Sequence, residues 1–266
     1  MSEKLSQVEN ATMGLLGGAL EVSCFQSLNY LKNASQQNLP LTLDPRKLYR
    51  GYPSNLLNMG SCTMWQFTVM SGMQKLLLQG ENRSLSDTEN LVSGMVAGMS
   101  SGLLGGPAEL MMIQQQVKGG SFAVRAKEIG PTRVLRGFFP CAMREGMWTV
   151  GYLSLPPLLR RKIMHNYGGS LNEEFARVGA SLFGAFLSCL VSHPFDTVKT
   201  CMQGDIEKKK YTSTIGTFRT IYSESGVAAF YRGTHWRYLR QFLAIFLLDK
   251  VRSDLTPIIF PHSDTS

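Results

Sequence analysis

Three stretches of the chain place proline, ionised side chains and glutamine inside otherwise apolar sequence. The clearest of them, residues 190–205, reads LVSHPFDTVKTCMQGD. A proline removes one backbone donor from a helix, and a charged side chain in an apolar surround needs a partner of opposite sign. The residue types in this stretch therefore predict ion pairs whose other members come from elsewhere in the chain.

The same pattern occurs in two earlier stretches. With Ser27, Pro107 and Pro194 superposed, the positions two, five and nine residues later hold Asn29, Glu109 and Asp196, then Lys32, Met112 and Lys199, then Gln36, Gln116 and Gln203. Similarity at a period longer than one helix pair indicates repeated structural units. Glutamine is present in all three copies, whereas the acid and the base are each missing from one copy.

An Arg-Gly pair follows each copy at the distance of a loop, and each pair precedes another apolar stretch. The pairs are Arg50-Gly51, Arg136-Gly137 and Arg232-Gly233. The elements that position the charges are thus predicted to be six helices, at residues 7–31, 54–79, 88–116, 138–163, 171–203 and 234–254. Each has about 20 to 30 residues, enough to cross a bilayer. The repeats are expected at 7–80, 88–163 and 171–256, with a short helix in each polar loop, as a single domain over residues 1–266.

The composition fits helices that face lipid on one side and water on the other. Of the 266 residues, 44% are hydrophobic and 17% are charged. The mean hydropathy of -0.05 is too polar for a bundle surrounded by lipid on every side. The net charge of +8 indicates acidic partners such as anionic lipids or solutes. No basic block interleaved with aromatic residues is present, so we expect no nucleic-acid partner.

The sequence predicts no enzyme, no metal site and no cofactor. The four histidines lack the spacing of metal ligands, and the five cysteines include no C-x-x-C pair and no disulfide framework. Walker, G-x-S-x-G and dinucleotide-binding glycine patterns are missing too. The first ten residues show neither a transit pattern nor a secretory apolar segment, so any membrane address is expected to be internal.

Together these motifs give the chain a family resemblance. Three phased copies of P-x-[DE]-x-x-[KR] with a downstream glutamine, and [DE]-G-x-x-x-x-aromatic-[KR]-G before the even helices, resemble the mitochondrial carrier family. The likeness covers about residues 12–254. It implies an all-α membrane protein of six transmembrane helices in three pseudo-threefold repeats with short matrix helices. Such a protein would lie in the inner mitochondrial membrane as a multi-pass solute carrier.

The resemblance also implies a gate at the matrix side. In this family the acid of each odd-numbered helix pairs with the base of the next one around a ring. The implied contacts are Glu109 with Lys199, Asp196 with Lys32, and the uncharged Asn29 with Met112. Loss of both members of one pair is nearly neutral, whereas loss of one member leaves an unpaired buried charge. The glutamines Gln36, Gln116 and Gln203 are expected to brace this gate.

A second gate is implied at the cytoplasmic side, where the even helices of the family carry [FY]-[DE]-x-x-[RK]. At the matching distance from the Arg-Gly turns only Arg160 fits this pattern. Asp249 and Arg252 stand about one helical turn early on the same face and are expected to substitute. The cytoplasmic gate is therefore predicted to be weak.

The expected substrate contacts lie seven residues past each Arg-Gly glycine and at the residue after that. The candidates are Asn58, Arg144, Glu145 and Arg240, and they resemble the amino-acid-type carriers. An arginine binds a carboxylate bidentately, and a glutamate binds an ammonium group. Neighbours on a helix do not face one another, so Arg144 and Glu145 are expected to need a ligand or another helix as partner. Arg237 is the alternative contact if the alignment slips by one turn, and Glu21 is expected to face the same cavity as Lys32.

The predicted function is transport of a small anionic or zwitterionic metabolite, an amino acid or carboxylate, by alternating access. The expected partners are a small-molecule substrate and anionic membrane lipid such as cardiolipin, and the protein is expected to be a monomer. The alternative is a carrier-derived membrane scaffold or receptor without transport activity, because the first repeat lacks the proline and the acid of the motif.

Overall fold

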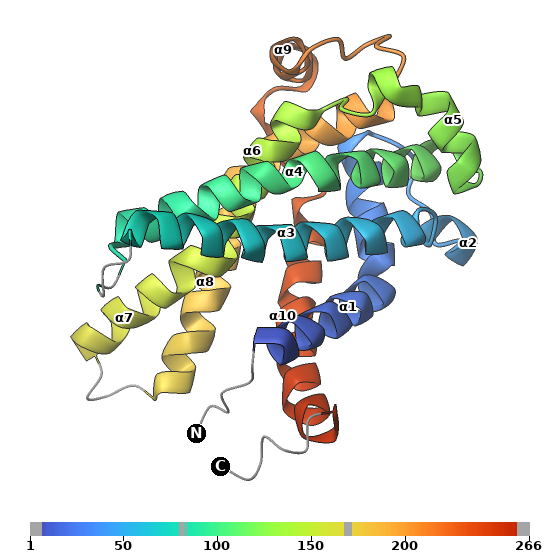
Figure 1. Ribbon diagram of the computed structural model, residues 1–266. Helices are drawn as coiled ribbons and strands as arrows, with labels where there is room; N and C mark the ends of the chain where they lie inside the picture. Colours follow the sequence, from blue (N-terminus) through green and yellow to red (C-terminus); the bar gives the residue numbers. More distant parts are fainter. Residues whose placement is uncertain (1–6, 80–82, 84, 168–171, 260–266) are drawn as a thin grey trace.

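All six predicted segments are helical in this computed structural model, which describes residues 7–79, 83, 85–167 and 172–259 (Figure 1). The long helices are α1 (Gln7–Gln36), α3 (Tyr52–Leu78), α4 (Asp87–Lys118), α6 (Phe138–Thr149), α7 (Leu155–Tyr167), α8 (Glu173–Gly204) and α10 (Thr234–Ile259). A π-helical turn, Val150–Ser154, joins α6 to α7 within the fourth predicted segment. The all-helical fold class is therefore confirmed for the described residues.

Short helices occupy the three polar loops. They are α2 (Pro45–Leu48), α5 (Phe122–Arg133) and α9 (Thr214–Ser225), and a 3-10 helix, Val227–Tyr231, follows the last. Each of α2, α5 and α9 begins at a side chain that accepts a hydrogen bond from a backbone N–H of the first turn: Asp44, Ser121 and Ser213 respectively. Such caps satisfy donors that a helix start leaves without a partner.

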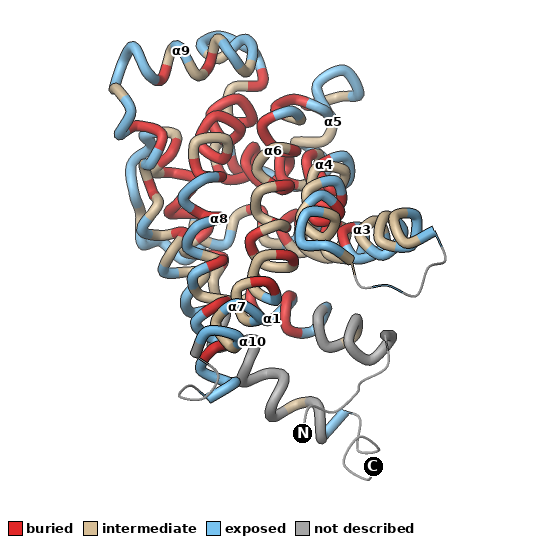
Figure 2. Tube along the Cα trace, turned by 90° about the vertical axis from the view of Figure 1, so that its left-hand side faces the viewer, coloured by how far each residue is buried: buried red, intermediate tan, exposed pale blue. Residues whose placement is uncertain are grey.

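The long helices form a closed ring within the described part of the chain. Consecutive helices contact one another, from α1 to α3, α4, α6 and α8. Helix α10 contacts both α8 and α1, so the last helix returns to the first. Figure 2 shows that buried segments concentrate toward the end of the molecule that carries α5 and α9.

Proline is not what breaks the first helix. Pro107 and Pro194 lie inside α4 and α8 as predicted. Helix α1 has Ser27 at the matching position, yet it leaves helical geometry at Phe25, where φ is -114° and ψ is 15°. A change of direction in α1 thus occurs without the residue that usually causes one.

The three Arg-Gly turns share one conformation and one packing relationship. Gly51, Gly137 and Gly233 have φ of 75°, 73° and 76°, the left-handed region that favours glycine. A Cβ on Gly51 would lie 2.9 Å from the carbonyl oxygen of Met112, and one on Gly233 would lie 2.9 Å from that of Lys32. At Gly137 the nearest atom would be Gln203 Cγ, at 3.2 Å. Each turn therefore packs against the first long helix of the next repeat: the turn at Gly51 against α4 and the turn at Gly137 against α8. The turn at Gly233 packs against α1, the first long helix of the first repeat.

By length and apolar composition, only α8 among the described helices passes as a membrane span on its own. The arrangement of six transmembrane helices therefore remains a prediction.

Candidate functional site

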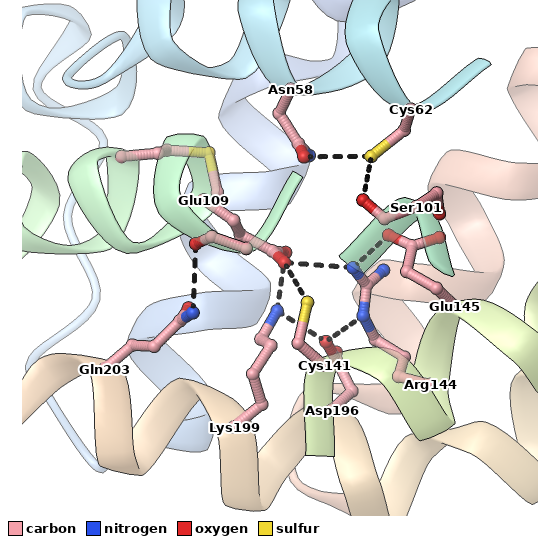
Figure 3. A network of polar contacts seen from close by, with 12 residues as sticks. Asn58, Cys62, Ser101, Glu109, Cys141, Arg144, Glu145, Asp196, Lys199 and Gln203 are labelled. Carbon is pink, nitrogen blue, oxygen red and sulfur yellow. Dashed lines mark hydrogen bonds and ion pairs between the residues drawn. The ribbon is translucent and has the colours of Figure 1, made fainter. Parts of the chain in front are cut away.

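The carboxyl-terminal halves of α1, α4 and α8 bring four predicted gate residues into one buried cluster. Lys32 Nζ lies 2.9 Å from Asp196 Oδ2, and Lys199 Nζ lies 2.5 Å from Glu109 Oε1. A third contact of 3.1 Å joins Lys199 Nζ to Asp196 Oδ1 and links the two pairs (Figure 3). We call these four residues the charge ring. Since all four are buried, each charge depends on its partners for stabilisation.

Neutral contacts occupy the position where the ring lacks a charge pair. Asn29 Nδ2 lies 3.4 Å from Met112 Sδ, so these two side chains do face one another. One turn further along, Asn33 Nδ2 donates to Gln116 Oε1 over 2.7 Å. Helices α1 and α4 are thus joined by weaker, uncharged contacts than the other two helix pairs.

The three predicted glutamine braces differ in what they contact. Gln36 Nε2 donates to Asp196 Oδ2 over 2.8 Å and so supports the charge ring directly. Gln116 instead accepts the hydrogen bond from Asn33. Gln203 donates to the backbone carbonyls of Gly106 and Arg136, which ties α8 to α4 and to the second Arg-Gly turn.

Arg144 of α6 extends into the charge ring (Figure 3). Its Nη2 lies 2.9 Å from Glu109 Oε2, and its Nε lies 3.6 Å from Asp196 Oδ1. Arg144 also forms an ion pair with the adjacent Glu145. The prediction that these neighbours would not contact one another is wrong, because an arginine side chain is long enough to curl back over the next residue. The expected need for partners on other helices is nevertheless met by Glu109 and Asp196.

Glu145 also contacts α3, through residues that the sequence analysis missed. Gln66 Nε2 lies 3.3 Å from Glu145 Oε2 and 2.9 Å from Ser101 Oγ. Tyr152 donates its hydroxyl to Gln66 Oε1 over 2.5 Å. Gln66 stands eight residues after Asn58, two helical turns along nearly the same face, and this spacing is the signal that could have identified it.

The third-repeat arginines are also paired. Arg240 Nη2 lies 2.8 Å from Glu21 Oε1, across the contact between α10 and α1. Arg237, the alternative candidate, donates to Ser192 Oγ over 2.8 Å and lies over the ring of Trp148, with 5.4 Å from Cζ to the ring centroid. Its Nη1 is 3.9 Å from Asp196 Oδ2. The structure thus places Arg240 beside Glu21, in the middle of α1, and Arg237 beside the charge ring.

Asn58, the first-repeat candidate, lies on α3 near a buried thiol. Cys62 Sγ is 3.5 Å from Asn58 Oδ1 and 3.7 Å from the Ser101 carbonyl (Figure 3). Another thiol, Cys141 Sγ, is 3.6 Å from Glu109 Oε2. Among the described contacts, Asn58 therefore meets Cys62 rather than a member of the charge ring.

The predicted cytoplasmic gate is only partly described. Arg160 lies on the surface of α7 and forms an ion pair with Glu173 at the start of α8. Asp249 and Arg252 belong to α10, but their side chains lie outside the described residues. Their prediction as a gate therefore stays a prediction.

A polar anchor outside the long helices holds the loop after α8. The Asp205 carboxylate accepts hydrogen bonds from the backbone N–H groups of Lys209, Lys210 and Tyr211. Burial raises the pKa of Asp205, but these bonds and the nearby Arg136 outweigh it and hold the pKa below its usual value. Burial lowers the pKa of Arg136, and the charge of Asp205 acts against that shift.

The arrangement offers binding chemistry of both signs. Two arginines, Arg144 and Arg240, present guanidinium groups to carboxylates, and Glu145 and Glu21 present carboxylates to cations. In residues 7–79, 83, 85–167 and 172–259, no group of three or more histidine, cysteine, aspartate or glutamate side chains is placed to hold a metal ion. A ligand entering this site must compete with ion pairs that the protein already makes.

Comparisons with known proteins find similar carriers. The family model described as "Mitochondrial carrier protein" matches residues 172–248. The mitochondrial glycine transporter YMC1 of Saccharomyces cerevisiae is 27% identical over 71% of this chain and 67% of its own length. The glutamate/glycine mitochondrial carrier ymc1 of Schizosaccharomyces pombe is 26% identical, over 70% and 67%. The mitochondrial glycine transporter of Kluyveromyces lactis is 24% identical over 91% of this chain and 94% of its own.

Proposed function

We propose that this chain, which is similar to mitochondrial carriers, carries a small amino acid across the inner mitochondrial membrane by alternating access. One central site would open first to one side of the membrane and then to the other. No covalent chemistry is needed, because transport requires only that the substrate bind both open states.

The observation that carries this proposal is the buried charge ring with paired arginines and glutamates beside it. Charged side chains inside a membrane protein are costly unless they are paired or serve a pathway for polar solutes. Here Lys32 with Asp196 and Lys199 with Glu109 join three helices from distant parts of the chain. These ion pairs hold the three helices together in the closed state. The helices can separate, and so reach the open state, only when the pairs break.

Site chemistry and relatives favour an α-amino acid as the substrate class. Arg144 suits a carboxylate, and Glu145 beside it suits an ammonium group. Asn58 and Arg240 are the further proposed contacts. The relatives are named as glycine or glutamate/glycine carriers, which matches a substrate bearing both charges.

The cyclic packing of the Arg-Gly turns supports three repeats and six transmembrane helices. The turns before α3, α6 and α10 contact α4, α8 and α1 in order, as threefold pseudosymmetry requires. We further propose that the protein works as a monomer, since the ring of helices closes within one chain. Basic residues of the matrix loops, such as Lys208, suit binding of cardiolipin.

Uptake by purified protein in liposomes tests the function. We expect saturable uptake of labelled glycine or glutamate, and none in liposomes without protein. Arg240→Gln and Glu145→Gln proteins that still melt cooperatively should lose this uptake. Uptake of a dicarboxylate with no amino-acid uptake would contradict the proposed substrate class, and failure with every metabolite tested would favour the non-transporting scaffold.

A further inference from the structure

Arg144 adds a cation to a charge ring that is short of one ion pair. The ring has two acids and two bases because position 29 holds asparagine and position 112 holds methionine. The ring residues come from α1, α4 and α8, whereas Arg144 comes from α6. Its guanidinium nevertheless reaches Glu109 on α4 and Asp196 on α8. It thereby ties α6 to both of these helices.

The contacts of Glu109 show that Arg144 is a full ion-pair partner within the charge ring. One carboxylate oxygen, Oε1, binds Lys199 at 2.5 Å, and the other, Oε2, binds Arg144 at 2.9 Å. Arg144 brings Glu145 with it as a partner of opposite sign, so the buried cluster gains one base and one acid. Together with the four members of the charge ring, Arg144 and Glu145 make three acids and three bases, and Arg237 lies at the edge of this cluster, 3.9 Å from Asp196.

We propose that Arg144 is both a gate residue and a substrate residue, and that a substrate carboxylate opens the gate by taking Arg144 away from Glu109. This inference rests on the proposed function for the identity of the competing group. In the empty protein Arg144 holds α6 to α4 and α8. In the occupied protein its guanidinium binds the substrate, and the ring is left with two pairs.

The same exchange explains why a substrate should carry both charges. A carboxylate that takes Arg144 separates it from Glu145 as well as from Glu109. An ammonium group on the same molecule then pairs with the freed Glu145, so no buried charge is left without a partner. A simple carboxylate lacks that second group and leaves Glu145 unpaired beside Gln66.

A variant that restores the missing pair separates the two roles of Arg144. Arg144→Gln alone should lower the melting temperature by several degrees and abolish uptake, because both the ring contact and the substrate contact are lost. Adding Asn29→Asp with Met112→Lys supplies a third ring pair that does not involve α6. We expect this triple variant to recover at least half of the lost melting temperature but none of the uptake.

Arg240→Gln provides the matched control. Arg240 is also an arginine paired with a glutamate, but its partner Glu21 lies outside the charge ring. Adding Asn29→Asp with Met112→Lys should therefore leave the melting temperature lost by Arg240→Gln unrestored. Equal rescue of both arginine variants would mean that the new pair stabilises the protein in general, and it would overturn the ring role.

Two other results decide the remaining alternatives. Rescue of uptake together with melting temperature would show that Arg144 does not bind the substrate. If the triple variant does not fold, a double-mutant cycle of Arg144→Gln and Glu109→Gln replaces it, and zero coupling overturns the ring role. Melting needs no substrate, so a wild-type protein that takes up no amino acid refutes the proposed function without affecting the test of the ring.

Discussion

Asp196 has an unusually dense set of cationic neighbours. Its carboxylate lies 2.9 Å from Lys32, 3.1 Å from Lys199, 3.6 Å from Arg144 and 3.9 Å from Arg237. These cations come from α1, α6 and α10 as well as from α8 itself, so one side chain of α8 holds charges from three other helices of the ring. Loss of this single negative charge leaves several buried cations facing one another.

We therefore expect Asp196→Asn to destabilise the protein more than Glu109→Gln. Glu109 contacts two cations, Lys199 and Arg144, and removing one partner of a buried pair costs about 3–5 kcal/mol. Thermal melts of the two variants in detergent give the comparison. Equal melting temperatures would show that the larger number of cations around Asp196 adds nothing to stability.

Pairing between distant residues was more predictable from sequence than pairing between neighbours. The contacts of Lys32 with Asp196 and of Lys199 with Glu109 follow from the repeat alignment, because equivalent positions meet around a ring. The contact of Arg144 with Glu145 depends on a rotamer, which sequence spacing does not determine. Gln66 was missed because a lone glutamine in an apolar segment gives no charge signal.

At the scale of elements, the three Arg-Gly turns should differ in their tolerance of a side chain. All three glycines have positive φ, so alanine is strained at each by about 1 kcal/mol. At Gly51 and Gly233 the new Cβ would also meet backbone oxygens at 2.9 Å, whereas at Gly137 it would meet a flexible glutamine side chain at 3.2 Å. We expect Gly137→Ala to be the mildest of the three in thermal melts, and the reverse order would contradict this packing.

The loop between α8 and α9 should respond to acid through Asp205. Its pKa is held below the usual value, so the stability it adds is present above a pH of about 4 and is lost as the pH falls through the lowered pKa. Asp205→Asn should therefore lower the melting temperature near neutral pH, with the difference from wild type shrinking below about pH 4.

A carboxylate in an exposed ion pair provides the control for this experiment. Glu224 pairs with Lys210 over 2.6 Å, and both side chains are about half exposed. Such pairs add little to stability, so Glu224→Gln should melt like wild type at every pH. A difference at Asp205 that persists undiminished in acid would show that its backbone hydrogen bonds do not depend on the ionised form.

The positions of the long helices followed from the sequence, but some helix ends did not: the first segment was predicted to end at residue 31, whereas α1 continues to Gln36. Apolar length and the Arg-Gly turns predicted the six long segments, and capping residues at the loops match the short helices. The π-helical turn Val150–Ser154 lies just before Pro156 and Pro157, which remove backbone donors that would bond back into it. The break at Phe25 has no proline to announce it, so it depends on packing that a single sequence does not show.

At the scale of the whole molecule, the proposed alternating access requires α1 and α4 to separate at the end that carries the charge ring. Asn29 and Met112 touch across these helices at 3.4 Å, so cysteines at both positions should form a disulfide when the ring is closed. In a background without the five native cysteines, oxidation of Asn29→Cys with Met112→Cys should stop uptake and a reducing agent should restore it. The single Asn29→Cys protein, oxidised in the same way, should continue to transport.

Uptake that continues in the fully cross-linked protein would contradict alternating access at this end. The extent of cross-linking is measured independently, by counting the free thiols that remain. The test does not depend on which amino acid is the substrate, because any solute that passes the ring needs the same separation.

Closure of the ring by its first and last helices constrains the order in which the protein can be assembled. The buried charges of α1, Glu21 and Lys32, find their partners in α10 and α8, at Arg240 and Asp196. Those partners are synthesised well over a hundred residues later, so a newly made α1 carries two charges that nothing yet neutralises. We infer that α1 inserts into the bilayer late. The insertion machinery must therefore keep the early helices in contact with water until the chain is complete.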